Sequence, residues 1–321
     1  MVGSVIVHNN KIIGESWHQK AGEAHAEVNA INSVTDEELL KEATIYVSLE
    51  PCSHFGKTPP CSDLIIAKGI KKVVIGTVDP FKKVAGRGIK KLLDAGCEVQ
   101  VGILEKECLE LNKRFLNFHK KERPYIILKW AQSEDGFIAP KQKKERRPVW
   151  ITNKFSGQLV HKWRSEESAI LVGTNTAIQD NPKLNVRSWS GKNPVRFLID
   201  RNLKISENAS ILDGSQQTIV LFDKNSTPTN RENLIYEKIE FSENISEQIC
   251  AVLVKHELQS VIIEGGSRTL QQFIDSSFWD EARIFTGNVQ FREGVKAPVF
   301  SGTLFEQYHL EKDHLKIYRN D

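Results

Sequence analysis

The 321-residue sequence lacks the features that would mark a membrane, secreted or nucleic-acid-binding protein. It has no apolar run near the roughly 20 residues that cross a bilayer, and no apolar signal-peptide segment follows Met1. Its five cysteines are an odd and scattered set, which does not fit a secreted disulfide framework. The formal net charge of +3 is too small to indicate a nucleic-acid or membrane surface as partner. We therefore expect a cytoplasmic protein that acts on a small molecule.

What remains is an ordinary globular composition, and the length favours two domains of roughly 150 residues each. The charged segment 120–124 ends in Pro124 and predicts a boundary between residues 1–122 and residues 123–321. Strands that alternate with helices predict an α/β fold for both halves. We expect one long amphipathic helix over residues 105–121, and a solvated flexible loop at the basic run 141–147.

The most informative stretch runs from His25-Ala26-Glu27 to Pro51-Cys52 and Cys61. One histidine and two cysteines can supply three ligands to Zn²⁺ and leave a fourth position for water, as in catalytic zinc sites. Because His25 and Cys61 are predicted at helix N-termini and Cys52 at a strand end, the three can converge on one point. Glu27 lies close enough in sequence to handle the protons of the water. Each residue alone would be unremarkable, and only the combination predicts a metal centre.

The segments HAEVNAI and LEPCSHFGKTPPC resemble the cytidine-deaminase-like superfamily. Most nucleobase deaminases of that superfamily carry Pro-Cys-x-x-Cys, whereas the interval here is longer and contains residues 56–60. That version, with Asp79-Pro80 and the segment 84–88, resembles the deaminase half of the bifunctional riboflavin-biosynthesis deaminase–reductase family. The resemblance implies zinc, Glu27 as the proton carrier, and a 2,5-diamino-6-(5-phosphoribosylamino)pyrimidin-4-one substrate.

Four loop residues have side chains suited to hold the base, ribose and phosphate of that substrate: His54, Lys57, Thr58 and Arg87. For the two cations the alternative is a solvated surface charge. Members of the family have a helix and an Asn-Pro segment before the strand that begins at Val2. Because this sequence has Met1 at that place, we expect the N-terminal helix to be missing.

In the second half, a predicted strand ends in Glu264-Gly265-Gly266 and is followed by a helix, which could form a phosphate cradle. The pattern alone is weak, because many such sites are only tight turns. It also differs from the G-x-G-x-x-G dinucleotide fingerprint. From the residues alone the choice between cradle and turn stays open.

Further motifs resemble the reductase half of the same family, which has a dihydrofolate-reductase-like fold. They are Lys129, Ser133-x-Asp135-Gly136, Trp150-Ile151-Thr152, Gly173-Thr174-x-Thr176, Asp180-Asn181-Pro182, Leu184-x-Val186-Arg187 and Glu264-Gly265-Gly266. The resemblance implies NADPH at Ala131, Trp150, Thr176, Asp180, Arg201, Gly266, Ser267, Arg268, Thr269, Leu270, Gln271 and Gln272. It implies substrate contacts from Lys129, Pro148, Leu184, Arg187 and Glu264, hydride transfer to the sugar, and a homo-oligomeric enzyme.

Three other functions remain open at this point. The chain could be a reductase that carries a degenerate, truncated deaminase. It could be a nucleobase or nucleic-acid deaminase with an accessory domain, although the Cys spacing and weak charge argue against that. It could also hold a structural zinc, for which His54 is a conceivable fourth ligand.

Overall fold

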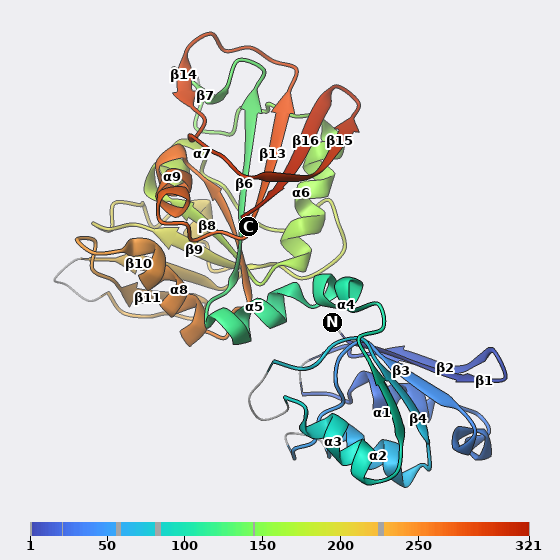
Figure 1. The fold of residues 1–321 in the computed structure, drawn as a ribbon. Helices are drawn as coiled ribbons and strands as arrows, with labels where there is room; N and C mark the ends of the chain where they lie inside the picture. The colour runs from blue at the N-terminus through green and yellow to red at the C-terminus, as the bar shows by residue number, and fades with distance from the viewer. Residues whose placement is uncertain are drawn as a thin grey trace. The chain divides into compact units, whose positions relative to one another are not determined.

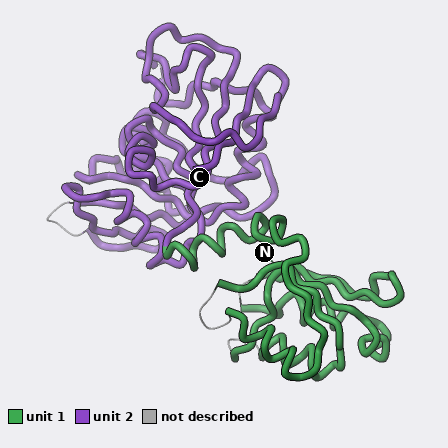
Figure 2. Tube along the Cα trace, viewed as in Figure 1, with its two compact units in different colours: residues 1–122 green, residues 123–321 purple. Residues whose placement is uncertain are grey.

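The computed structural model describes residues 2–20, 22–55, 59–80, 85–143, 145–223 and 228–320. The chain divides into two compact units, Met1–Glu122 and Arg123–Asp321 (Figure 2). Both combine sheets with helices, so the expected α/β class is confirmed (Figure 1). None of the helices in the described ranges combines the length and the apolar character that crossing a bilayer requires.

The first unit contains a five-stranded sheet in the order β2-β1-β3-β4-β5. The hairpin of β1 and β2 pairs antiparallel, β1 also pairs antiparallel with β3, and β3, β4 and β5 run parallel. Valine and isoleucine dominate the central strands, as expected of a pleated surface that is buried on at least one face. The strands are β1 (Gly3–His8), β2 (Lys11–Trp17), β3 (Thr44–Val47), β4 (Lys72–Ile75) and β5 (Glu98–Val101).

Three helices bury their apolar sides against this sheet: α1 (Ala26–Asn32), α2 (Cys61–Ala67) and α3 (Arg87–Asp94). Ile31 of α1, Ile65 of α2 and Leu92 of α3 lie in one buried cluster with Ile45 and Ile75 of the strands. A short 3-10 helix, Glu37–Lys41, leads into β3. This packing brings the start of α1, the start of α2 and the chain after β3 close together.

The expectation of one helix over residues 105–121 is wrong. The structure has two helices, α4 (Glu105–Leu111) and α5 (Lys113–Lys121), which meet at Asn112. The backbone there has φ −102° and ψ 12°, outside the α-helical range, and the Asn112 side chain donates to the carbonyl of Cys108 at 3.2 Å. Asparagine side chains compete for backbone hydrogen bonds in this way, which explains why the apolar periodicity continues while the helix does not.

The second unit contains a nine-stranded sheet in the order β11-β10-β9-β8-β12-β6-β13-β16-β15. All pairs from β11 to β13 are parallel, and β16 and β15 continue the sheet antiparallel. A separate pair of strands, β7 (Phe137–Pro140) and β14 (Gly294–Lys296), lies beside it. The nine strands are β6 (Tyr125–Ser133), β8 (Ala169–Gly173), β9 (Val195–Ile199), β10 (Thr218–Phe222), β11 (Leu234–Lys238), β12 (Ser260–Gly265), β13 (Glu281–Gly287), β15 (Thr303–Leu310) and β16 (Asp313–Arg319).

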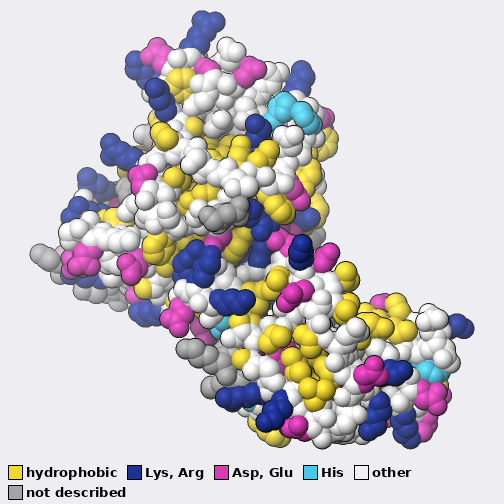
Figure 3. All heavy atoms as spheres, in the orientation of Figure 1, with side chains coloured by type: hydrophobic (Ala, Val, Ile, Leu, Met, Phe, Trp, Pro, Cys, Tyr) yellow, Lys and Arg dark blue, Asp and Glu magenta, His cyan; other side chains and the backbone are white. Residues whose placement is uncertain are grey.

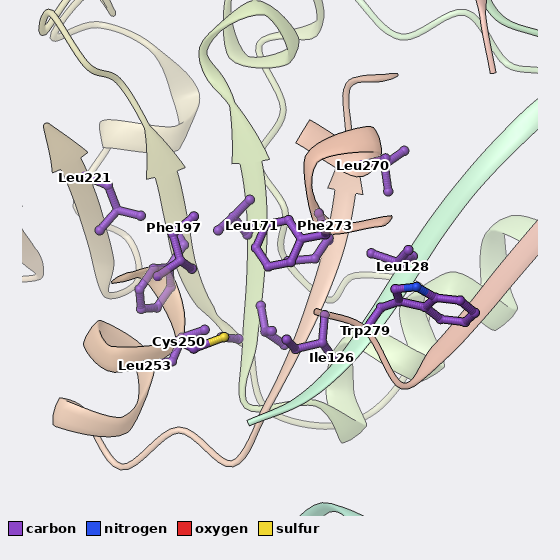
Figure 4. Close-up of a cluster of buried hydrophobic side chains, with 14 of the residues drawn as sticks. Ile126, Leu128, Leu171, Phe197, Leu221, Cys250, Leu253, Leu270, Phe273 and Trp279 are labelled. Carbon is purple, nitrogen blue, oxygen red and sulfur yellow. The ribbon is translucent and has the colours of Figure 1, made fainter. Parts of the chain in front are cut away.

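Successive strand residues face opposite sides of this sheet, so each side has its own core. Ile126 and Leu128 belong to one buried cluster, whereas Ile127 between them belongs to the other. Figure 4 shows the first cluster, in which the strand residues Leu171 and Phe197 lie with Phe273. The first core is closed by α8 (Ile245–Lys255) and α9 (Ser267–Asp275), and the second by α6 (Lys154–Glu166), α7 (Thr174–Asp180) and a 3-10 turn, Ser210–Leu212.

The basic run 141–147 is not wholly solvated. Lys143 makes an ion pair with Asp180, and its side chain is only 13% exposed. The Arg146 Nε donates to the carbonyl of Ile178 at 2.6 Å. The expectation of a flexible solvated loop is therefore wrong at these two positions, because the C-terminal turn of α7 offers a carboxylate and a free carbonyl that attract cations.

Candidate active sites

The three expected metal ligands of the first unit converge. His25 is the N-cap of α1, Cys61 is the first residue of α2, and Cys52 follows β3. The His25 Nδ1 lies 3.3 Å from the Cys61 Sγ and 3.5 Å from the Cys52 Sγ. All three ligand atoms lie within 4.8 Å of one another. The three ligands lie on different parts of the chain, and the packing of α1 and α2 on the sheet brings them together.

The residues present fit a zinc ion. A tetrahedral ion about 2.3 Å from sulfur and 2.0–2.1 Å from nitrogen separates its N and S ligands by about 3.6 Å, close to the distances observed. The group consists of His25, Cys52 and Cys61, and within the described ranges His54 does not join it. Three protein ligands leave a position for water, which matches a catalytic site better than a closed structural one.

Hydrogen bonds from the start of α2 hold Cys52 in place. The Cys61 N–H donates to the Cys52 Sγ at 3.3 Å, and both the N–H and the hydroxyl of Ser62 donate to the Cys52 carbonyl at 3.1 and 3.0 Å. On the other side, the ring of His18 contacts that of His25 edge to face, with centroids 5.3 Å apart. Such outer contacts orient metal ligands and are part of the site.

The charge balance of the site suits a cation and a proton carrier. A hydrogen bond from Cys61 lowers the pKa of the Cys52 thiol to about 4, and the same interaction, with burial, raises that of Cys61. Glu27 is 3% exposed, and burial raises the pKa of its carboxyl to about 7. A carboxyl with a pKa near neutrality can both accept and release a proton, as general acid–base catalysis requires.

The expected substrate contacts of the first unit are only partly described. Lys57 and Thr58 lie outside the described residues. His54 is partly buried in the loop after Cys52, and Arg87 is exposed at the first position of α3. Arg87 follows Gly86, which has φ +79°, a conformation that glycine adopts without strain.

In the second unit, a buried ion pair lies at the end of β12. Arg164 of α6 donates to Glu264 with two nitrogens, Nη2 to Oε2 at 2.7 Å and Nε to Oε1 at 3.2 Å. The side chains are 11% and 9% exposed. Arg164 is not recognisable as a site residue from the sequence, because an arginine near the end of an amphipathic helix is typical of a surface charge and its partner is 100 residues away.

Cations surround this glutamate. Burial alone would raise the pKa of Glu264, but the charges of Arg164 and Lys129 and the Arg164 hydrogen bond lower it to about 2. Burial lowers the pKa of Lys129, and the nearby Glu264 opposes that effect. Lys129 also lies 6.0 Å from the ring centroid of Phe285. The structure therefore brings together Lys129 and Glu264, both expected from sequence, and adds Arg164.

A loop that carries Leu184 and Arg187 is fastened to α6 beside this pair. His161 accepts the Arg187 N–H at its Nδ1, at 3.4 Å, and Arg164 donates to the Asn185 carbonyl at 3.4 Å. Leu184 is buried, with φ +54°. The Arg187 guanidinium is exposed and donates to the Asn185 side chain at 2.9 Å. Its planar fork is well suited to a phosphate.

Two strand-to-helix turns lie side by side at the ends of β8 and β12. A Cβ on Gly173 would lie 2.6 Å from the Thr269 hydroxyl, and one on Gly266 would lie 3.3 Å from the Thr176 hydroxyl. Gly265 has φ +134°. The expected cofactor residues Thr176, Gly266 and Thr269 thus come together, at the carboxyl ends of parallel strands where ligands of such sheets bind.

The remaining expected contacts are more dispersed. Trp150 is 68% exposed, Pro148 is exposed and Ala131 is half-buried. Asp180 pairs with Lys143, and Arg201 pairs with Asp223 at 3.1 Å. Leu270 lies entirely in the core, so that only its backbone could face a ligand. Ser267 donates to the Lys296 carbonyl and Gln271 bonds the Val299 backbone, whereas Arg268, Gln271 and Gln272 line a shallow surface pocket.

Both units resemble known proteins. Residues 124–321 match the family model described as RibD C-terminal domain, and residues 1–77 match the cytidine and deoxycytidylate deaminase zinc-binding region. The riboflavin biosynthesis protein RibD of Aquifex aeolicus is 41% identical over 298 residues, which cover 92% of this chain and 82% of the relative. That of Bacillus amyloliquefaciens is 36% identical over 313 residues, covering 95% and 83%.

Among solved structures, a diaminohydroxyphosphoribosylaminopyrimidine deaminase/5-amino-6-(5-phosphoribosylamino)uracil reductase from Thermotoga maritima superposes with a TM-score of 0.89. Its sequence is 34% identical, and the match covers 99% of this chain and 91% of the other. The likeness thus extends over both units.

Proposed function

Since the chain belongs to the family of the riboflavin biosynthesis protein RibD, which joins a zinc-dependent deaminase to a reductase, we propose that its first unit deaminates a phosphorylated ribosylaminopyrimidine and that its second unit then reduces the ribosyl group. The enzyme is bifunctional, and its cofactors are zinc and NADPH. The substrate best supported is 2,5-diamino-6-(5-phosphoribosylamino)pyrimidin-4-one, since the Thermotoga relative is named for that chemistry.

The observation that carries the deaminase is the convergence of His25, Cys52 and Cys61 beside the buried Glu27. This geometry supports the full enzyme over a reductase with a degenerate deaminase, because three metal ligands and an acid–base carboxyl lie together. A zinc ion held by His25, Cys52 and Cys61 would lower the pKa of a bound water and so supply the nucleophile for the amino-bearing carbon at neutral pH. Glu27 would take one proton from this water and pass it to a ring nitrogen as the hydroxide adds. It would then take the remaining proton of the added hydroxyl and deliver it to the amino group, so that a carbonyl forms as ammonia departs.

In the second unit the protein supplies position and charge. NADPH supplies a hydride to C1 of the sugar when it is bound, which opens ribose to ribityl. Glu264, held by Arg164, accepts hydrogen bonds from the substrate, while Lys129 orients the sugar hydroxyls. The exposed guanidinium of Arg187 pairs with the substrate phosphate. The turn at Gly266, next to Thr176, would hold the cofactor phosphates on backbone N–H groups.

We further propose that the partner is this small molecule and not nucleic acid, that the enzyme is a homo-oligomer, and that it works in the cytoplasm. On the face seen in Figure 3, basic and acidic side chains are interspersed, and the net charge is only +3. Self-association is supported by β15, an edge strand of the sheet, which exposes Leu304, Phe305 and Tyr308.

The proposed function is tested by paired assays of ammonia release and NADPH oxidation. Glu27→Gln is expected to keep about one zinc per chain and to lose roughly 10²- to 10⁴-fold in ammonia release, the range that a proton carrier contributes. NADPH oxidation with the deaminated substrate is expected to be unchanged, because the second site lies in the other unit. Unaltered ammonia release would refute the role of Glu27. Loss of both activities by a folded variant would refute the assignment of two sites.

A further inference from the structure

A buried carboxylate, Glu50, precedes the expected metal ligand Cys52. In the described part of the chain, its hydrogen bonds go to residues other than His25, Cys52 and Cys61. Glu50 is 3% exposed and stands two residues before Cys52, between the end of β3 and Pro51. Its own N–H donates to the Thr77 carbonyl at 2.9 Å, which holds its backbone beside the chain after β4. No role in the reaction described above requires this side chain.

The side chain of Glu50 instead gathers backbone N–H groups from the segment that leads into α3. Its Oε2 accepts from Gly86 at 2.9 Å and from Asp79 at 3.3 Å. Its Oε1 accepts from Gly88 at 2.9 Å and from Ile89 at 3.3 Å. Four donors and the positive end of α3 compensate a buried negative charge. Glu50 therefore ties the start of α3 to the chain that leads into Cys52.

A close backbone contact also constrains this segment. A Cβ on Gly88 would lie 2.0 Å from the Pro51 carbonyl oxygen and 3.2 Å from the Glu50 Oε1. Only glycine allows so close an approach of two backbones. Gly86 and Gly88 thus rest against Glu50 and Pro51, and Arg87 between them is held at a fixed offset from Cys52.

We propose that Glu50 is a positioning residue of the deaminase, which sets the distance between the metal centre and the cation of Arg87. This inference rests on the proposed function and adds to it a determinant of specificity: the substrate class is selected by its phosphate, which Arg87 receives while the ring amine lies at the metal. Glu50 touches neither group. It keeps both ends of the substrate in register, because a shift of about 1 Å in a binding group can cost about 10²-fold in rate.

The experiment compares ammonia release from the 5′-phosphorylated substrate and from its dephosphorylated form, with zinc content measured for every protein. Glu50→Gln keeps the size of the side chain but replaces one acceptor oxygen by an NH2 donor, which faces backbone N–H donors. It is expected to retain about one zinc per chain and to raise KM for the phosphorylated substrate at least tenfold, with kcat within about threefold. Kinetics with the dephosphorylated form are expected to match those of the wild type.

Two further variants and one control keep the test decisive. Gly88→Ala pushes the segment away from Pro51 and is expected to give the same selective rise in KM, should Glu50→Gln fold poorly. The double variant Glu50→Gln/Arg87→Ala is expected to lose no more than Arg87→Ala alone. Asp63→Asn is the matched control: Asp63 pairs with Lys91 of α3, away from the segment, and wild-type kinetics are expected.

Equal losses on both substrates together with loss of zinc would show a purely structural role and overturn the inference. An unchanged KM in Glu50→Gln and Gly88→Ala, or multiplied losses in the double variant, would overturn it as well while leaving the deaminase intact. If folded, zinc-loaded wild-type protein released no ammonia, the proposed function itself would fail and this inference with it.

Discussion

Removing Arg164 tests how the second unit maintains a buried carboxylate. Arg164→Met keeps most of the apolar volume of the side chain but leaves Glu264 buried without its bidentate partner. The pKa of Glu264 falls from 4.5 to about 2, and each pH unit corresponds to about 1.36 kcal/mol. The ionised form is thus stabilised by roughly 3 kcal/mol at pH 7. Removing one partner of a buried pair generally costs a similar amount, about 3–5 kcal/mol.

We expect Arg164→Met to lower the free energy of unfolding of the second unit by about 3 kcal/mol at pH 7. Because the folded pKa of Glu264 lies below the unfolded value, its contribution is complete above about pH 4.5 and is lost as the pH falls toward 2. The difference between variant and wild type is therefore expected to shrink below pH 4.5. Lys129 remains near the carboxylate and prevents a larger loss.

Urea unfolding followed by tryptophan fluorescence measures this effect. Five of the six tryptophans report on the second unit: Trp130, Trp150, Trp163, Trp189 and Trp279. The double variant Arg164→Met/Glu264→Gln removes both charges and is expected to recover at least half of the loss, since an unpaired buried charge is the main penalty. Wild-type stability of the single variant, or a double variant no more stable than the single, would refute the reasoning.

Two other predictions concern single side chains. Cys52→Ala is expected to weaken zinc binding at least about 100-fold, since mutating even a residue that only hydrogen-bonds a metal ligand lowers metal affinity 10- to 100-fold. Zinc is measured after dialysis against a chelator. One zinc per chain remaining in the variant would contradict the metal site. Burial, with the charges of Arg164 and Arg187, lowers the pKa of His161 to about 4, so NMR should show no titration of its ring near pH 6.5. As the pH falls, the imidazole of the unfolded chain binds its proton at a higher pH than that of the folded chain. The free energy of unfolding is therefore expected to decrease as the pH falls from about 6.5 to 4, and a pKa near 6.5 for His161 in the folded protein would disprove this.

The first site could be predicted from the sequence because its chemistry restricts residue types. Few side chains bind zinc, and His25, Cys52 and Cys61 occur with an acid two positions from the histidine, so the pattern carries information without any geometry. The residue types of Glu50 and Arg164 do not by themselves indicate what these side chains do. Each owes its role to partners that only the fold brings near, backbone N–H groups in one case and a carboxylate 100 residues away in the other.

The fold was predicted where periodicity was strong and local. The strand before Cys52 and the strand that ends in Glu264-Gly265-Gly266 correspond to β3 and β12, whose β-branched residues predict buried strands. The break between α4 and α5 at Asn112 was not predicted. The Asn112 side chain bonds the backbone of its own helix and interrupts it, although the apolar pattern continues without a break. The strands β15 and β16 were missed because β15 is exposed on nearly every residue and shows no alternation.

The separate cores of the two units have an evolutionary consequence. The buried cluster of the first unit draws its residues from positions 6–97, and the two clusters of the second unit from positions 125–315. A break between Glu122 and Arg123 would leave all three whole, and Arg123 would keep its paired contacts with Asp280 at 2.6 and 2.8 Å. Genes for the two activities could therefore fuse or separate at this point without dividing a core.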